Sequence, residues 1–261
     1  MKGRTTIALN GVKRVVEQTL SERSEDILLN SREGGADSQR SSDGIVANSW
    51  PGHRSNENHI PRGTNSNDMS TPPGEYYTEE RWQNWIDRIE EEDIDPEDED
   101  SARLLLNLQD DTAIAVAKII TDYDDSELEE ETALDELADI RETVLSEIDI
   151  DDEEKLMLID GVQTSLVCVF YAAEEYIVGG VAEEGTVSEY IEAASEAEAE
   201  EDLDAALGYC AQAGTRIIDG EELDRDAAED LEFGLVAEWV NGLDSLQTAM
   251  SDPEVVEEDD E

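Results

Sequence analysis

The pattern of apolar residues from residue 78 onward predicts a series of α-helices. Apolar side chains recur there at three- and four-residue steps, which places them along one face of a helix. Thr78 can cap the first of these helices, with Glu79 and Glu80 at the positive end of the helix dipole. No sustained alternation of apolar and polar residues predicts a strand. The sequence therefore predicts an all-α fold.

Residues that typically begin and end helices divide this region into a single bundle of about six to seven helices. The predicted starting points are Thr78, Asp95-Pro96, Ser126 with Glu129, Asp151 with Glu154, Thr186 with Glu189, Asp202 and Asp224. The helix that carries residues 156–178 is apolar on more than one face, so we expect it to be central. Gly179-Gly180 should end that helix. Gly220 should end the helix that runs from about Asp202 to Ile218, and Pro253 should end the last helix, which runs from about Asp224 to Met250.

Composition divides the chain into three parts. Residues 1–74 are predicted to be either disordered or a mis-assigned upstream extension, because they are rich in Ser, Asn, Gly and Arg and show no sustained period. Residues 75–250 should form the bundle, and residues 251–261 an acidic disordered tail. We expect the native protein to begin near Met69; the alternative is a genuine flexible N-terminal tail.

The net negative charge of the chain comes entirely from the residues after residue 68. Residues 1–68 contain nine basic and nine acidic side chains, whereas residues 69–261 contain 8 basic and 62 acidic ones and carry the whole formal charge of −54. A compact globule with this charge repels itself in dilute buffer, and molar salt screens that repulsion. An acidic disordered chain is the competing interpretation. Leu, Ile, Val and Phe form 27% of residues 101–250, which favours a folded, halophilic protein.

Cysteine use and hydropathy indicate a cytoplasmic protein. Cys168 and Cys210 lie in apolar helical stretches, which suggests buried thiols in a reducing compartment rather than a disulfide framework. No convincing signal peptide is present. The most apolar segment, residues 162–173, is shorter than a membrane span requires. We therefore expect no membrane partner.

Histidine is absent from the predicted bundle, since His53 and His59 both precede it. This excludes a Ser-His-Asp or Cys-His nucleophile and a histidine-based metal site within the bundle. The Asp-rich turns at residues 122–126 and 149–152 lack the glycine of a calcium loop. We therefore assign no catalytic residue, no cofactor and no metal ligand. The bundle also lacks a basic patch, so we expect no direct binding of nucleic acid.

Four aromatic residues at the start of the bundle form the one candidate interaction site: Tyr76, Tyr77, Trp82 and Trp85. Trp and Tyr often anchor protein interfaces, and Trp82 and Trp85 share a face of a short edge helix. The competing interpretation is that this helix docks on its own bundle, because small domains gain much of their stability from buried aromatic side chains. Trp239 is expected in the core.

The stretches Glu75 to Ile89 and Leu156 to Gly180 carry a resemblance to an uncharacterised archaeal family, mainly haloarchaeal, that is classed as a domain of unknown function. The resemblance extends to about Met250 and fits a protein that begins at Met69, but it supplies no activity to transfer. The sequence thus favours a protein-interaction module with an unidentified protein partner. A carboxylate-only enzyme, with or without a dependence on Mg²⁺, and a structural homo-oligomer are the alternatives.

Overall fold

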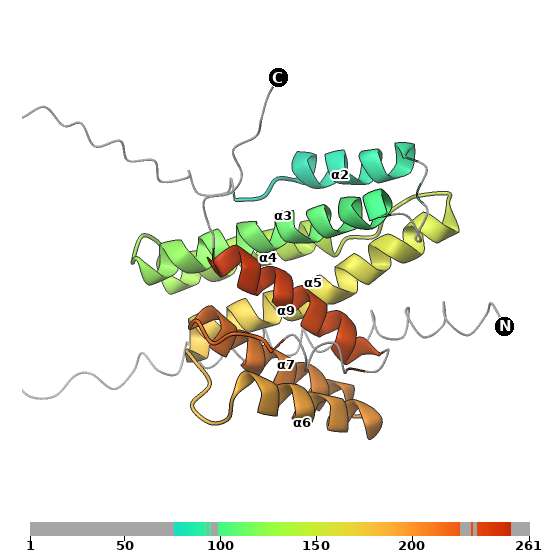
Figure 1. The fold of residues 1–261 in the computed structure, drawn as a ribbon. Coiled ribbons are helices and arrows are strands. Elements are labelled where there is room, and N and C mark those ends of the chain that lie inside the picture. The colour runs from blue at the N-terminus through green and yellow to red at the C-terminus, as the bar shows by residue number, and fades with distance from the viewer. Residues whose placement is uncertain (1–75, 93, 95–98, 225–230, 232–233, 252–261) are drawn as a thin grey trace, which may run out of the picture. The chain divides into compact units, whose positions relative to one another are not determined.

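The computed structural model describes residues 76–92, 94, 99–224, 231 and 234–251, and these form seven α-helices and no strand (Figure 1). The predicted N-terminal segment, the Asp95-Pro96 helix start and the acidic tail lie outside the described residues. The helices are α2 (Glu79–Glu91), α3 (Glu99–Asp124), α4 (Glu130–Val144), α5 (Glu153–Gly179), α6 (Val187–Ala199), α7 (Leu203–Ile218) and α9 (Leu235–Ser251). The prediction of an all-α bundle of about six to seven helices is confirmed.

Helix α5 is the centre of the bundle and contacts α3, α4, α7 and α9. Its position follows from its composition, because apolar side chains on several faces, such as Leu166, Val169 and Phe170, are fully buried. The side chain of Asp152 caps its first turn by accepting the N–H groups of Glu154 and Lys155 at 3.0 and 3.3 Å.

Helix α5 ends as predicted at the glycine pair. Gly179 is its last residue, and Gly180 follows with a φ of 74°, in the region that glycine adopts without steric cost. In the described part of the chain α5 is also the one helix long and apolar enough to cross a membrane, and 67% of its most apolar stretch is buried inside the protein. Such burial is typical of a core helix.

Two glycines allow helices to pack against α5 at very short range. A Cβ atom on Gly214 of α7 would lie 2.3 Å from the Cβ of Ala172. A Cβ atom on Gly242 of α9 would lie 2.2 Å from the carbonyl oxygen of Ser165. Neither position can hold a side chain unless the helices separate.

A buried polar network joins α3, α5 and α9. The side-chain amide of Gln109 donates to Ser245 Oγ at 2.9 Å and to the Asn241 carbonyl at 3.2 Å, and it accepts from Ser165 Oγ at 2.6 Å. Ser245 in turn donates to Asp110 at 2.7 Å. These bonds satisfy the buried polar side chains of Gln109, Ser165 and Ser245.

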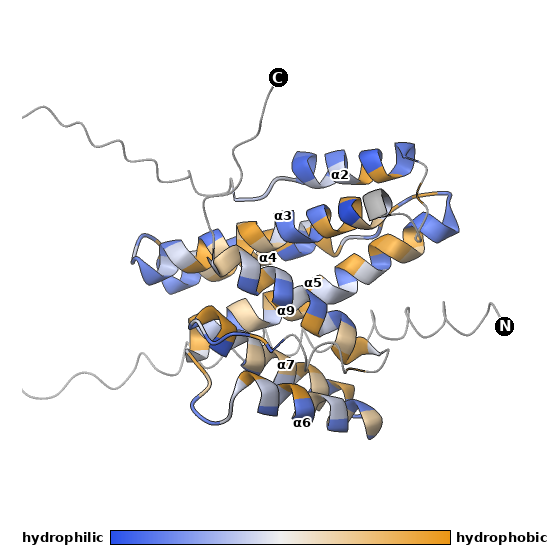
Figure 2. Ribbon diagram, in the orientation of Figure 1, coloured by the Kyte–Doolittle hydropathy of each residue, from blue (hydrophilic) through white to orange (hydrophobic). Residues whose placement is uncertain are grey.

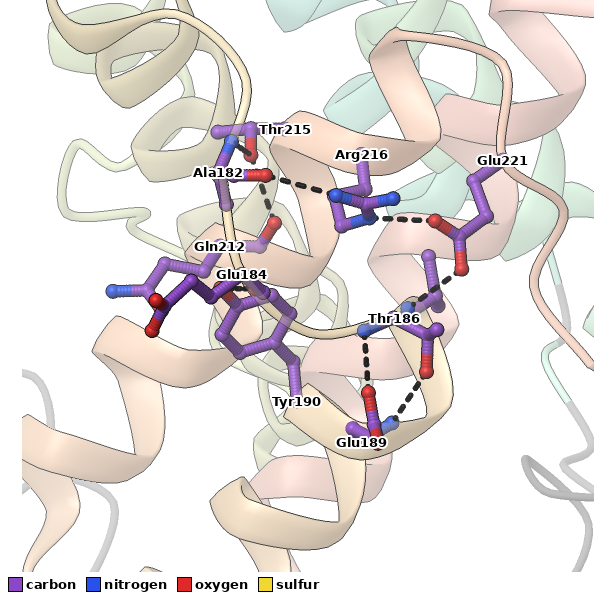
Figure 3. A network of polar contacts seen from close by, with 10 residues as sticks. Ala182, Glu184, Thr186, Glu189, Tyr190, Gln212, Thr215, Arg216 and Glu221 are labelled. Carbon is purple, nitrogen blue, oxygen red and sulfur yellow. Dashed lines mark hydrogen bonds and ion pairs between the residues drawn. The ribbon is translucent and has the colours of Figure 1, made fainter.

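The connection between α5 and α6 is fastened to the end of α7 (Figure 3). Arg216 donates to the Ala182 carbonyl at 2.9 Å and to Glu221 at 2.6 Å. The other oxygen of Glu221 accepts the first N–H of α6, from Val187, at 2.9 Å. Thr186 begins α6 with the predicted capping box.

Three predicted helix starts are wrong. The cap of α5 is Asp152 rather than Asp151, one residue later than predicted. Ser126 does not cap α4: it has a φ of 60° in the turn that follows α3, and α4 begins at Glu130. The continuous helix predicted from about Asp224 to Met250 is wrong, because Leu231 and Gly234 are not helical and the last helix, α9, begins at Leu235. Its first N–H, that of Leu235, donates to the carboxylate of Glu198 on α6 at 2.6 Å, so a distant side chain sets this start.

Candidate functional site

Helix α2 is held against α3 by the buried carboxylate of Asp111. This side chain accepts the Nε1 proton of Trp85 at 2.8 Å and the Nε proton of Arg81 at 2.9 Å, and it makes a further contact with the Arg81 guanidinium. The Arg81 guanidinium also lies over the ring of Tyr77, 5.5 Å from its centre. Long polar side chains therefore position α2, which Figure 2 shows to be mostly hydrophilic.

The two tyrosines before α2 are anchored in the same way. Tyr76 donates to Asp122, and the ring of Tyr77 is buried beside Thr112, whose hydroxyl donates to the Tyr77 oxygen at 3.5 Å. Burial raises the pKa of both phenols well above the usual value. Both hydroxyls therefore keep their protons at a pH where an exposed tyrosine would ionise, and Tyr76 remains the donor to Asp122.

Of the four aromatic residues predicted as an interaction site, Tyr76, Tyr77 and Trp82 are buried and Trp85 is half-buried. They secure the α2 segment to α3 and α4, as the competing interpretation expected. Trp239 is buried in the core as predicted. A role of the four in binding a partner stays a prediction; Tyr76 and Tyr77 would have to leave these contacts to bind one, whereas Trp82 also lines the groove described next.

A groove of about 530 Å³ lies between α2, the end of α4 and the connection to α5. Apolar side chains that reach it are Trp82 and Ile86 from α2 and Ile148 from the connection. Five carboxylate side chains also line it: Glu79, Glu90, Glu142, Glu147 and Asp149. The remaining lining residues are Gln83, Thr143 and Ser146. The volume lies within the range that ligand pockets occupy, roughly 300–1,000 Å³.

The groove combines an apolar interior with an acidic rim. Trp82 and Ile86 are buried and Ile148 is half-buried, whereas all five carboxylate residues are exposed. None of the described residues that line the groove is Lys or Arg. Its potential is therefore negative, and it offers five exposed carboxylates to a cation. Its apolar surface comes mainly from the half-buried Ile148, because Trp82 and Ile86 are almost fully buried.

Lys155 holds the C-terminal end of α2, which forms one wall of the groove. Its ammonium group donates to the backbone carbonyls of Glu90 and Glu92 at 2.7 and 2.6 Å, at the C-terminal end of α2. A cation there also complements the negative end of the helix dipole. Lys155 is one of two lysines in residues 69–261, so a rare charge is placed where it positions a helix.

Sequence reasoning did not identify the groove. Its carboxylates are a small part of the acidic residues of this region, and no individual Glu or Asp is distinguished by its neighbours. The one usable signal is Ile148, an apolar residue between Glu147 and Asp149.

The structure also shows where metal-ligating side chains and thiols lie. Within the described ranges, no group of three or more His, Cys, Asp or Glu side chains is arranged to hold a metal ion. Cys168 and Cys210 are both buried free thiols.

Comparison with known proteins gives one match. Residues 75–259 match the model of a family described as an uncharacterized protein conserved in archaea (DUF2150). No curated protein and no solved structure matches the chain.

Proposed function

Since this chain belongs to the archaeal family DUF2150, whose description names no activity, we propose its function from the groove. The protein is an interaction module that binds a basic, amphipathic segment of another protein between α2 and the end of α4. The observation that carries this proposal is the pairing of apolar lining residues with a rim of exposed carboxylates and no basic residue.

The chemistry of the occupant follows from the groove. Lys or Arg side chains on a bound segment would pair with Glu142, Glu147 and Asp149 on one wall and with Glu79 and Glu90 on the other. An apolar side chain of the segment would contact Trp82 and Ile148. An acidic rim disfavours nucleic acid, whose phosphates it would repel.

A carboxylate-only enzyme has less support at this site. A general acid or base needs a carboxyl group whose surroundings set it apart from solvent, and the groove carboxylates are exposed. Exposed charges are better suited to steering and pairing with a charged partner.

We propose that the module works in the cytoplasm at high salt. Of the Asp and Glu residues whose side chains are described, only Asp111 and Glu136 are buried, so the acidic residues cover the surface of an apolar core. Molar salt shortens the Debye length to about 3 Å, so only charges in direct contact still attract one another. Apolar contacts in the groove then become a larger share of the binding free energy.

The test uses a defined probe: a labelled 16-residue peptide with Lys and Arg on one helical face and Leu on the other. Fluorescence anisotropy in 0.5 to 3 M KCl measures its dissociation constant. We expect the dissociation constant to rise with salt and binding to persist at the highest concentration. Replacing the Leu residues of the peptide by Ser should abolish binding, because the apolar contacts are lost.

A matched pair of variants separates the groove from general attraction to an acidic protein. Glu142→Gln/Glu147→Gln removes two charges from the groove, and Glu192→Gln/Glu196→Gln removes two exposed charges from α6. Each exposed ion pair contributes about 0.5 kcal/mol, so the loss of two, about 1 kcal/mol, should make the groove variant bind about fivefold more weakly. Equal weakening by the two variants would show that the peptide binds to the surface at large and would refute the proposal.

A further inference from the structure

The two cysteines of the chain are buried on two helices that pack against each other. Cys168 lies on α5 and Cys210 on α7, and both side chains are fully buried. The whole chain contains two cysteines, so an intramolecular disulfide has one possible pairing.

The packing of α5 against α7 brings these residues to the same level. Gly214 approaches Ala172 so closely that an added Cβ would lie 2.3 Å from the Ala172 Cβ. Cys210 and Cys168 each lie four residues, about one helical turn, before those positions. The two helices run in the same direction, because Thr215 near the end of α7 accepts from Ala182, just after the end of α5, at 3.1 Å.

The thiols are close enough to affect each other. Burial raises the pKa of the Cys168 thiol well above its usual value, and the neighbouring Cys210 raises it further. A disulfide requires Cα atoms about 4.4 to 6.8 Å apart. The close approach of Gly214 to Ala172, one helical turn away, brings the two backbones nearer than ordinary helix packing does and so favours such a separation.

We propose that Cys168 and Cys210 are a reversible redox pair that forms a disulfide between α5 and α7. The oxidant is a low-molecular-weight disulfide. The thiolate of one cysteine attacks it, forms a mixed disulfide and releases one small thiol; the second cysteine then displaces the other small thiol. Two protein thiols are oxidised and one small disulfide is reduced to two thiols. Because both cysteines are buried, the first attack requires a transient opening of the α5–α7 contact.

The bond would lock a defined part of the fold. The chain between the two cysteines contains α6 and the connection that Figure 3 shows fastened to Arg216 and Thr215. Oxidation would therefore fix the α6–α7 hairpin on α5, and reduction would restore the free thiols. The state of the pair would report the thiol–disulfide balance of the cell as a change in the stability of this half of the bundle.

The experiment equilibrates the protein with reduced and oxidised glutathione, once folded in molar KCl and once in denaturant. Each equilibrium is approached from the reduced and from the oxidised protein. Alkylation of free thiols in denaturant followed by mass spectrometry gives the oxidised fraction, and peptide mapping should join Cys168 to Cys210. We expect the equilibrium constant for disulfide formation to be at least about tenfold larger in the folded protein, because the fold holds the thiols together.

A variant with a displaced thiol is the matched control. Cys210→Ala with Gln212→Cys keeps two cysteines and nearly the same loop, but position 212 lies on another face of α7, toward the α5–α6 connection in Figure 3. The equilibrium constant for disulfide formation in this variant should be no larger in the folded protein than in denaturant. The proposal is overturned if the wild-type constant is no larger in the folded protein than in denaturant. That comparison needs no variant and decides the matter even where the variant fails to fold.

Discussion

Replacing Asp111 by Ala should release α2 while the rest of the bundle stays folded. The carboxylate of Asp111 is buried and accepts hydrogen bonds from Arg81 and Trp85, the two residues of α2 that face it. Without it, the half-buried Trp85 donor loses its partner. The α2 wall of the groove then rests on Lys155 and on the apolar contacts of Trp82 and Ile86.

The size of the effect follows from the exposure of the partners. The Trp85 bond contributes about 1 kcal/mol, the typical net value of a hydrogen bond. The Arg81 side chain is 38% exposed, so water can replace much of the interaction that its guanidinium loses. The ion pair with Asp111 therefore contributes about a further 1 kcal/mol. A loss of about 2 kcal/mol in the free energy of local opening corresponds to about a 30-fold increase in the population of the open state.

Native-state hydrogen exchange in molar KCl measures this opening. Amides of α2 in the Asp111→Ala variant should exchange about 30-fold faster than in wild type, and those of α5 should change little. Asp87→Ala is the control, since Asp87 is an exposed residue of α2 that accepts from Gln83 within the same helix. Unchanged exchange in α2, or equal acceleration in α2 and α5, would refute the view that Asp111 holds α2 locally.

Three further predictions concern packing, pH and salt. Gly242→Ala should lower the free energy of unfolding by about 1–3 kcal/mol, because the added Cβ would strike the Ser165 carbonyl. Gly161→Ala should raise the free energy of unfolding by about 0.5–1 kcal/mol, because the added Cβ meets open space and alanine favours the helix. Thermal melts of both variants check these opposite signs. The Val187 N–H lowers the pKa of Glu221, so the ionised carboxylate stabilises the fold at a pH above the usual pKa of Glu. This stabilisation is lost as the pH falls through the lowered pKa, because the carboxylate then takes up a proton. The difference in melting temperature between wild type and Glu221→Gln should therefore shrink on acidification. Dialysis from molar KCl into dilute buffer should reduce helical circular dichroism, because carboxylate repulsion is no longer screened; an unchanged spectrum and melting curve would contradict adaptation to salt.

The sequence could predict those features that local signals determine. Thr78, Asp202 and Thr186 cap helices because each places an oxygen within three residues of a free N–H, and all three predictions are confirmed. The central position of α5 followed from its composition, which no exposed helix could carry. Gly180 ended it for an equally local reason.

Features that depend on distant parts of the chain could not be predicted. Helix α9 begins where Glu198 of α6 meets Leu235, and residues 37 positions apart give no shared local signal. Ser126 fitted a capping pattern, but the N–H groups of Glu127 and Leu128 instead bond back to the Asp122 carbonyl and close the end of α3. The groove escaped prediction for the same reason, since its walls come from α2 and from the end of α4, and acidic residues occur throughout.

The carboxylates of Glu198 and Glu221 each cap the start of a helix that lies more than 30 residues away in the sequence. Asp111, Asp152 and Asp202 also hold or cap helices, whereas most other acidic residues of the described chain are exposed. A variant designed to fold in dilute buffer could exchange those exposed residues for neutral ones. Exchange of Glu198 or Glu221 would leave a backbone N–H at a helix start without its acceptor. A redesign guided by net charge alone would therefore remove contacts between helices together with charges that only cover the surface.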